Sequence, residues 1–293
     1  MPDLTQLAQS LVNGIGVGLI YGFVGMGFSV IYDSSGVVNF AQGVFVMLGG
    51  MMAHAFFVTL GLPLVVAAAL AIAGTVGVGL LLELLVVRPM WLRRAPLFTI
   101  ILATLASQTI IERLTILTAG GQPRTFGNFT SGGPLKIAGV AISYQILWIL
   151  GVSTLLVGLL WLFFARSRIG RALRACAQNR DAAALLGIPV MRMLSVSFAL
   201  SAALGAIAGV LITPTQYTAF NVGGAFGISG FIAAIIGGFG SAFGALLGGV
   251  LLGVAQALAV LFFGATLKNV IALSLMLIVL LTFPQGLFRR SGH

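Results

Sequence analysis

Residues 11–31 read LVNGIGVGLIYGFVGMGFSVI, a run without a single charged side chain. A helix that crosses the hydrocarbon core of a membrane needs about 20 predominantly apolar residues. This run therefore predicts a membrane-spanning helix. The ten residues before it contain Asp3 and no Lys or Arg, which does not fit the basic start of a cleaved signal peptide. We expect the run to remain in the protein as its first span.

The rest of the chain has the same character. Of its 293 residues, 59% are hydrophobic and 7% are charged, and the mean hydropathy is +1.15. Soluble domains carry roughly a quarter charged residues, so this composition excludes a secreted disulfide scaffold, a nucleic-acid-binding domain and a soluble Rossmann enzyme. The apolar content is enough for roughly eight crossings. We predict an all-α, polytopic helical membrane protein, with residues 1–293 forming one transmembrane domain.

Polar interruptions divide the chain into its expected spans. These lie at about 11–31, 37–60, 64–87, 96–117, 142–165, 193–212, 227–264 and 267–283. The third span is expected to stop at Arg88-Pro89, and the stretch 118–139 has no span character. Gly237-Gly238-Phe239-Gly240-Ser241 breaks the 227–264 segment, which is therefore two elements or one discontinuous helix.

The charge of the chain sets its orientation. The net charge is +10, and Lys and Arg collect in the cytoplasmic loops of membrane proteins. The basic loops at 88–94 and 166–192 fall on the same side if spans alternate, and we place that side in the cytoplasm. With eight spans, Arg289 and Arg290 would then fall outside. The span count must therefore change, and the glycine-broken 227–264 segment is the place where we expect it to do so.

Glycine is the second informative residue type, with 40 in the chain. Gly14, Gly18 and Gly22 have the four-residue spacing that lets helices pack closely in lipid. Two other glycine-rich stretches, 36–43 and 237–244, look like two versions of one pattern, a glycine break followed by a small-residue helix start. Paired breaks of this kind indicate an internal repeat and a translocation path, although a glycine-rich membrane protein also produces such matches by chance. The candidate path residues are Asn39, Gln42, Gly43, Gly240, Ser241 and Gly244.

Few polar residues interrupt the apolar segments. Asn39 and Gln42 share one helical face and either line a polar path or cap the helix that starts there. Glu83 and Glu112 are near segment ends, where a locally paired or snorkelling charge is the simplest interpretation. His54 has no nearby His, Cys or acid that would complete a metal site. Gln108, Gln256 and Asn269 are further polar residues within the apolar segments.

The motifs of an enzyme are missing from the sequence. It contains no Gly-x-Ser-x-Gly and no Walker-type phosphate loop, and the single cysteine, Cys176, can form neither an intrachain disulfide nor a Cys-based metal site. We expect no catalytic residue, metal or bound cofactor. Buried carboxylates for a proton relay are also scarce. If the protein moves a solute uphill, the energy is expected to come from another subunit.

The cytoplasmic loop indicates what that subunit is. Residues 171–186 read as one short helix that ends at Gly187-Ile188-Pro189, with Arg171, Arg174, Gln178 and Asp181 on a polar stripe. Small residues form the opposite stripe, although Arg180 falls on it and interrupts the pattern. Such a helix, tied at both ends to spans, suits docking into a partner's groove. The alternative is a solvated loop whose arginines only fix the orientation.

Three motifs then resemble a known family. Asp181-Ala182-Ala183-x-x-x-Gly187 is similar to the Glu-Ala-Ala-x-x-x-Gly loop of ATP-binding-cassette importer permeases, with Asp in place of Glu. Together with Asn39-Phe40-Ala41-Gln42-Gly43 and the Gly237 to Gly244 stretch, it resembles the branched-chain amino acid permease family from about Leu11 to Gly286. The sequence departs from the family pattern at Gln42, where His is commoner.

The resemblance implies an inner-membrane permease subunit of a bacterial importer. Such a subunit pairs with a second, similar permease, two cytoplasmic ATPases that use the ATP, and a periplasmic binding protein that delivers the amino acid. The implied ATPase-coupling residues are Arg171, Arg174, Asp181, Ala182, Ala183 and Gly187. Other members of this family are similar to transporters of urea, short amides and other amino acids. The resemblance therefore does not identify the solute. A self-contained channel or uniporter for such a solute, and a non-transporting membrane scaffold, are the alternatives.

Overall fold

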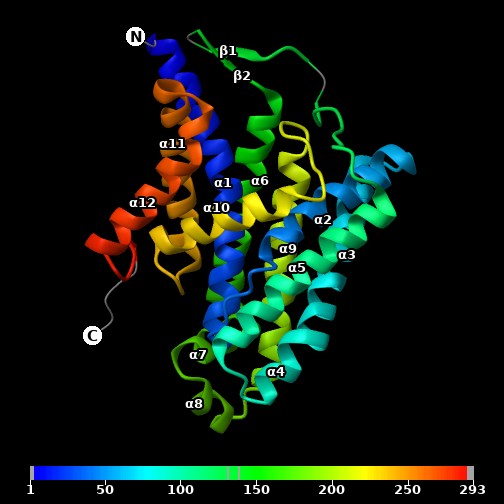
Figure 1. Ribbon diagram of the computed structural model, residues 1–293, viewed down its shortest axis with the longest axis vertical. Coiled ribbons are helices and arrows are strands. Elements are labelled where there is room, and N and C mark those ends of the chain that lie inside the picture. The colour runs from blue at the N-terminus through cyan, green and yellow to red at the C-terminus, as the bar shows by residue number, and fades with distance from the viewer. Residues whose placement is uncertain (1–2, 131, 138, 289–293) are drawn as a thin grey trace.

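The computed structural model describes residues 3–130, 132–137 and 139–288, and helices dominate it (Figure 1). In chain order the elements are α1 (Leu4–Ser35), α2 (Gln42–His54), η1 (Ala55–Thr59), α3 (Leu64–Leu82), η2 (Glu83–Val87), α4 (Arg88–Leu92), α5 (Leu97–Ala119), β1 (Leu135–Ile137), β2 (Val140–Ile142), α6 (Tyr144–Arg166), α7 (Arg168–Gln178), α8 (Arg180–Leu185), α9 (Val190–Ile212), α10 (Val222–Gly237), α11 (Ala242–Phe263), η3 (Ala265–Leu267) and α12 (Lys268–Thr282). Eight helical stretches are long and apolar enough to cross a membrane. The predicted polytopic helical fold is confirmed.

The two ends of the molecule differ in character. The short helices α4, α7 and α8 lie at one end, which we call the basic end because the 88–94 and 166–192 loops are there (Figure 1). The opposite end, the hairpin end, carries β1 and β2, which pair antiparallel with Leu135 opposite Ile142. This hairpin is the exception to the all-α prediction, and it lies in the stretch expected to have no span character. From the positive-inside rule we still expect the basic end to face the cytoplasm.

The expected stop at Arg88-Pro89 is wrong. The helix continues from α3 through the π-helical turn η2 into α4 and ends at Leu92. A proline ring inside a regular α-helix clashes with the carbonyl four residues earlier. The wider π-helical turn just before Pro89 relieves that clash, so the chain stays helical.

The glycine-broken segment is two elements. α10 ends at Gly237 and α11 begins at Ala242, with the turn between them at Gly238 and Gly240. α10 begins earlier than expected and adds a shorter apolar helix to the eight longer ones. The Leu287 amide donates to the Ile236 carbonyl at 2.9 Å, so the chain after α12 returns to the end of α10. Arg289 and Arg290 themselves lie outside the described residues.

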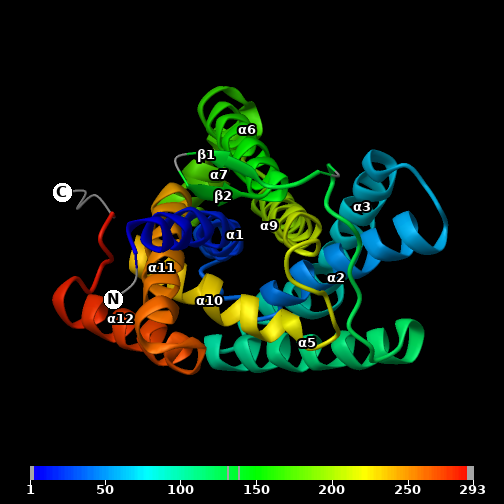
Figure 2. The same ribbon diagram turned by 90° about the horizontal axis from the view of Figure 1, so that it is seen from above.

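The helices form a buried centre and an outer ring. Seen from the hairpin end, α1, α2, α9 and α10 surround the middle of the molecule, and α3, α5, α6 and α12 lie outside them (Figure 2). The most apolar stretch of α1 is 83% buried, whereas that of α12 is 11% buried. Since the outer helices leave many apolar side chains exposed, these side chains suit contact with lipid or with another membrane subunit.

Small residues hold the centre together. A Cβ atom added to Gly18 would lie 2.7 Å from the Val250 Cα, and one added to Gly22 would lie 3.0 Å from the Leu246 Cα. The backbones of α1 and α11 therefore touch along the predicted glycine stripe, as expected where hydrophobicity cannot drive helices together in lipid.

Two helices begin inside the bundle, and they meet there. α2 starts at Gln42 after the non-helical segment 36–41, and α10 starts at Val222 after the segment 213–221. Gly43 and Gly223 touch, since a Cβ atom on Gly223 would lie 3.2 Å from the Gly43 carbonyl oxygen. Each start follows a long helix, α1 or α9, and the two segments enter from opposite ends of the molecule. The structural counterpart of the 36–43 break is therefore 213–224, and not 237–244 as the glycine pattern indicated.

Candidate functional site

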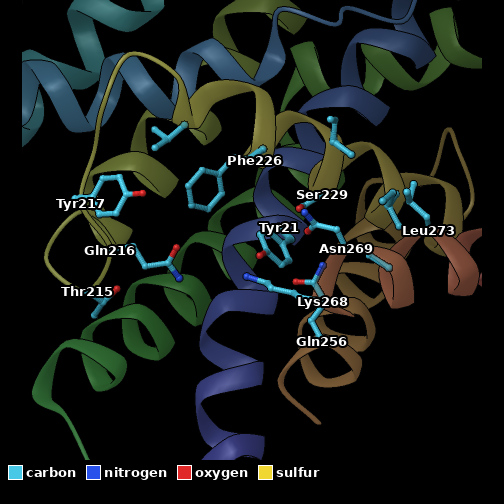
Figure 3. A pocket seen from close by; sticks show the side chains of 15 residues that line it. Tyr21, Thr215, Gln216, Tyr217, Phe226, Ser229, Gln256, Lys268, Asn269 and Leu273 are labelled. Atoms are coloured by element: carbon cyan, nitrogen blue, oxygen red, sulfur yellow. The ribbon is translucent and has the colours of Figure 1, made fainter. Parts of the chain in front are cut away.

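A cavity of about 520 Å³ opens between α1, α10, α11 and α12 (Figure 3). Its volume lies in the range of small-molecule sites, roughly 300–1,000 Å³. One wall is apolar and includes Phe226, Ile232 and Leu273. Polar side chains come from five parts of the chain: α1 (Tyr21), the loop before α10 (Thr215, Gln216 and Tyr217), α10 (Ser229), α11 (Gln256) and α12 (Lys268 and Asn269).

Gln256 is the most deeply placed polar group of the cavity. It lies on α11, is 2% exposed, and its Oε1 atom has no hydrogen-bond partner among the described residues. A buried carbonyl without a partner is costly and calls for an explanation. The contact of α11 with α1 fixes its position, because the two backbones touch at Gly18 and Gly22.

Lys268 and Asn269 form the first turn of α12. The chain reaches them through Gly264 and the short 3-10 helix η3. Figure 3 shows the Lys268 amine reaching into the cavity beside the Tyr21 hydroxyl. Gln256 and Asn269 stand out in the sequence as polar residues of apolar segments, whereas Lys268 does not, because a lysine at the start of an apolar segment is an ordinary feature of span ends. Gln256 and Lys268 are 12 residues apart with a turn between them, so no helical periodicity connects the two positions in the sequence.

Asn39 and Gln42 lie at the start of α2, in the middle of the helix bundle. Gln42 is fully buried, its Nε2 donates to the Ser201 carbonyl at 3.2 Å, and the Ser201 hydroxyl donates to its Oε1. Asn39 accepts from the Ala41 amide at 3.1 Å in a turn just before α2, while its Nδ2 is buried and has no hydrogen-bond partner among the described residues. The two residues thus brace the break between α1 and α2.

The other three predicted path residues are elsewhere. Ser241 caps α11 by accepting from the Gly244 amide at 3.1 Å. Gly240 lies beside the Asp33 carboxylate at the end of α1, and Gly244 packs on Gly237. The structure therefore divides the six residues into a group at the centre of the bundle and a group near the basic end.

The loop 166–192 is not the single helix that the sequence predicted. Asn179 has an extended backbone and separates α7 from α8, and its Oδ1 accepts from the Ala182 amide at 3.0 Å as the cap of α8. Asn is a strong helix N-cap, which is the physical reason for the break. Arg180 then begins a new helix, so the apolar stripe predicted for one continuous helix does not apply to it.

The apolar face of the loop packs on its own chain. Leu173, Cys176 and Ala183 are buried together with Met193 of α9. The exposed members of the predicted set are Arg171, Arg174, Asp181, Ala182 and Gly187. Leu185 and Leu186 are 89% and 81% exposed. These two leucines, which do not belong to the predicted apolar stripe, are the apolar residues that α8 and the residue after it present outward.

Two buried or half-buried acids have partners. Glu83 is fully buried, pairs with Arg88 at 2.8 Å, and accepts from the Ser195 hydroxyl at 3.2 Å. The local pairing expected for Glu83 is confirmed, and Ser195 adds a link to α9. Glu112 accepts from the Gln108 Nε2 at 2.9 Å within α5, rather than from its neighbour Arg113.

With the geometry established, the chain can be compared with known proteins. Residues 10–280 match the family described as "Branched-chain amino acid transport system / permease component". The permease protein BraD of the high-affinity branched-chain amino acid transport system of Pseudomonas aeruginosa is 36% identical over 305 residues, which cover 99% of this chain and 98% of BraD. The corresponding LivH protein of Escherichia coli K12 is 31% identical over 300 residues, covering 96% and 95%.

A solved structure has the same fold. One chain of PsaBC from Streptococcus pneumoniae, determined in complex with a Fab, aligns with a TM-score of 0.52 at 14% identity and covers 95% of this chain and 92% of its own length. At this identity the likeness concerns the fold alone.

Proposed function

Because the chain belongs to the branched-chain amino acid transport system permease family, we propose that it carries a branched-chain amino acid across the membrane as the permease subunit of an ATP-binding-cassette importer. The single observation that carries this conclusion is the family match, which runs from α1 to α12 and covers residues 10–280. Relatives matched over almost their whole length are permease proteins of such transport systems. The protein is a multi-pass subunit of the plasma (inner) membrane.

The assembly that we propose has four kinds of component. This chain pairs with a second, homologous permease; two ATPases bind on the cytoplasmic side; and a periplasmic binding protein delivers the amino acid. The exposed apolar surfaces of the outer helices support a second membrane subunit as a neighbour. ATP belongs to the ATPases, so this chain acts as one permease domain without catalysis or a cofactor of its own.

We assign α7 and α8 to coupling with the ATPases. They lie at the basic end, which the positive-inside rule favours as the cytoplasmic end. α8 and the residue after it present Leu185 and Leu186 outward near the exposed Asp181, and exposed apolar side chains beside a charged one are typical of a protein interface. Ala183 is buried against the bundle and anchors α8 instead of contacting a partner.

We infer that the two helix starts at the centre of the bundle form part of the translocation path. Discontinuous helices whose starts meet near the membrane midplane mark the substrate path in many transporters. Asn39, Gln42 and Gly43 supply one start and Val222 and Gly223 the other. Gly240, Ser241 and Gly244 are adjacent to the coupling side, where they join α11 to the end of α1.

Purification and reconstitution test the proposal. The tagged protein, extracted from its native membrane in mild detergent, should bring a second permease and two ATPases into the eluate. Proteoliposomes containing that complex should take up leucine, isoleucine or valine only with ATP and the binding protein. Uptake of urea or an amide without any ATPase would support the channel alternative, and no flux of any solute with all partners present would support the scaffold.

A further inference from the structure

We propose that the cavity between α1, α10, α11 and α12 binds the amino acid itself, with Lys268 holding its carboxylate and Gln256 its ammonium group. This inference rests on the proposed function and specifies where the solute binds. It is carried by an uncompensated cation, an unpartnered buried carbonyl and an apolar wall that meet in one cavity.

The cation of the cavity lies at a helix start. Lys268 is the first residue of α12, where the helix dipole is positive and a cation is disfavoured. Among the described residues no Asp or Glu lines the cavity, and the ion pair that the structure contains, Arg88 with Glu83, lies elsewhere. A lysine and a helix N-terminus that point at the same space attract an anion. The Tyr21 hydroxyl beside the amine adds a second donor.

The carbonyl of the cavity lacks a donor. Gln256 Oε1 is buried and has no hydrogen-bond partner among the described residues. An ammonium group satisfies such an oxygen with a charge-assisted hydrogen bond. The cavity therefore offers one group for each charge of a zwitterion.

The rest of the wall suits an aliphatic side chain. Phe226, Ile232 and Leu273 face the same cavity, and Tyr21 is held against Phe226 with ring centroids 6.1 Å apart. A neutral amide or urea can satisfy neither Lys268 nor the anion-attracting helix start as well as a carboxylate does. The geometry therefore favours an apolar amino acid over neutral solutes such as urea and short amides.

Charge replacement at Lys268 tests the assignment. The complete transporter, reconstituted with its ATPases and binding protein, is assayed for leucine uptake. Lys268→Gln should lower uptake roughly tenfold or more, the effect expected when a charged hydrogen bond to the transported group is lost. Lys268→Arg should retain most of the uptake. Lys136→Gln, which removes the chain's other lysine from the exposed strand β1, is the matched control and should transport as the wild type does.

Chemical restoration of the charge separates binding from folding. In a Cys176→Ala background, Lys268→Cys should transport poorly and should recover after modification with 2-aminoethyl methanethiosulfonate, which rebuilds a lysine-like cation. The neutral methyl reagent should not restore uptake. Equal recovery with both reagents, or wild-type uptake by Lys268→Gln, would overturn the carboxylate site. If the wild-type complex imports no branched-chain amino acid at all, the proposed solute fails, and this inference fails with it.

Discussion

The guanidinium group of Arg180 lies against Gly36, the residue at which α1 ends. A Cβ atom on Gly36 would be 2.7 Å from one terminal nitrogen of Arg180, and Gly36 has a backbone φ of 68°, which favours glycine. Arg180 belongs to helix α8 at the basic end, whereas Gly36 starts the segment that leads to Gln42 at the centre of the bundle. A movement of α8 therefore reaches the start of α2 through one side-chain contact.

Arg180→Ala should uncouple ATP hydrolysis from transport. The contact between α8 and the 36–41 segment is lost, while α8 keeps its cap and its buried Ala183. We expect leucine uptake per ATP hydrolysed to fall several-fold, roughly as a loss of 1–1.5 kcal/mol predicts. Uptake and ATPase rates are measured on the same proteoliposomes. Arg192→Ala, an exposed arginine near the same end, is the control, and an equal loss in both variants would attribute the effect to net charge alone.

The Glu83–Arg88–Ser195 cluster should stabilise the junction of α3, α4 and α9. Glu83 is buried with its pair at 2.8 Å, and Arg88 also donates to the Ser195 hydroxyl at 2.7 Å. Glu83→Gln weakens the charged hydrogen bonds, which typically contribute about 1.5–3 kcal/mol each. We expect a lower thermal midpoint in detergent and a coupling energy with Arg88→Met in a double-mutant cycle. Strictly additive effects of the two substitutions would contradict the pairing.

Gly27 should be unable to accept a side chain while Gln42 is present. A Cβ atom there would collide with the Gln42 amide and lie 2.7 Å from the Ser201 hydroxyl oxygen. Gly27→Ala should therefore destabilise the protein, by roughly the 1–3 kcal/mol of an overpacked core. Adding Gln42→Ala removes the amide that the new methyl group meets and also frees the Ser201 hydroxyl, which Gln42 holds, to turn away. The double variant should therefore unfold at a higher temperature than Gly27→Ala. A double variant less stable than either single one would show that Gln42 is not the obstacle.

Part of this architecture was accessible from the sequence. Apolar runs of span length located every long helix, because the bilayer requires a fixed number of apolar residues whatever the packing. The glycine stripe of α1 predicted its close contact with α11. The start of α10 was not visible in the same way, since the polar residues from Thr213 to Asn221 look like an ordinary loop and only packing brings Gly223 to Gly43.

The candidate sites were less predictable for a related reason. Gln256 and Asn269 were recognised as polar residues in apolar segments, but Lys268 has meaning only next to them in the cavity. The break at Asn179 replaced one expected helix by two, because a local side-chain cap can end a helix within a continuous apolar pattern. Glu83 was recognised as paired with its neighbour Arg88, while Ser195, far away in the sequence, required the fold.

Cys176 should react slowly with thiol reagents. The side chain is 1% exposed, and burial raises the pKa of the thiol, an effect that the positive charge of Arg180 opposes in part. Because the thiolate is the reactive form, the labelling rate should still increase with pH above the ordinary pKa of a cysteine thiol. Ala177→Cys in a Cys176→Ala background is exposed on α7 and should react much faster. Labelling of Cys176 by an impermeant reagent from outside intact cells would contradict the cytoplasmic placement of α7.

Gly187 can be needed for its backbone conformation or for a contact with a partner, and substitutions distinguish the two roles. Its φ is 80°, in the left-handed region, and nothing in the described structure lies within 4 Å of a Cβ atom added there. Gly187→Val should abolish uptake with normal protein levels in the membrane, because β-branched residues are poorly tolerated at such a φ, whereas Asn adopts it readily.

Gly187→Asn therefore decides between the two roles. If the glycine serves only to turn the chain from α8 into α9, the Asn variant should import leucine at close to the wild-type rate. If the open space beside Gly187 is filled by an ATPase in the assembled transporter, the Asn variant should also fail, and its complex with the ATPases should dissociate in mild detergent. We expect the second result, since Leu185 and Leu186 next to it are exposed and apolar. Normal uptake by Gly187→Val would refute both roles.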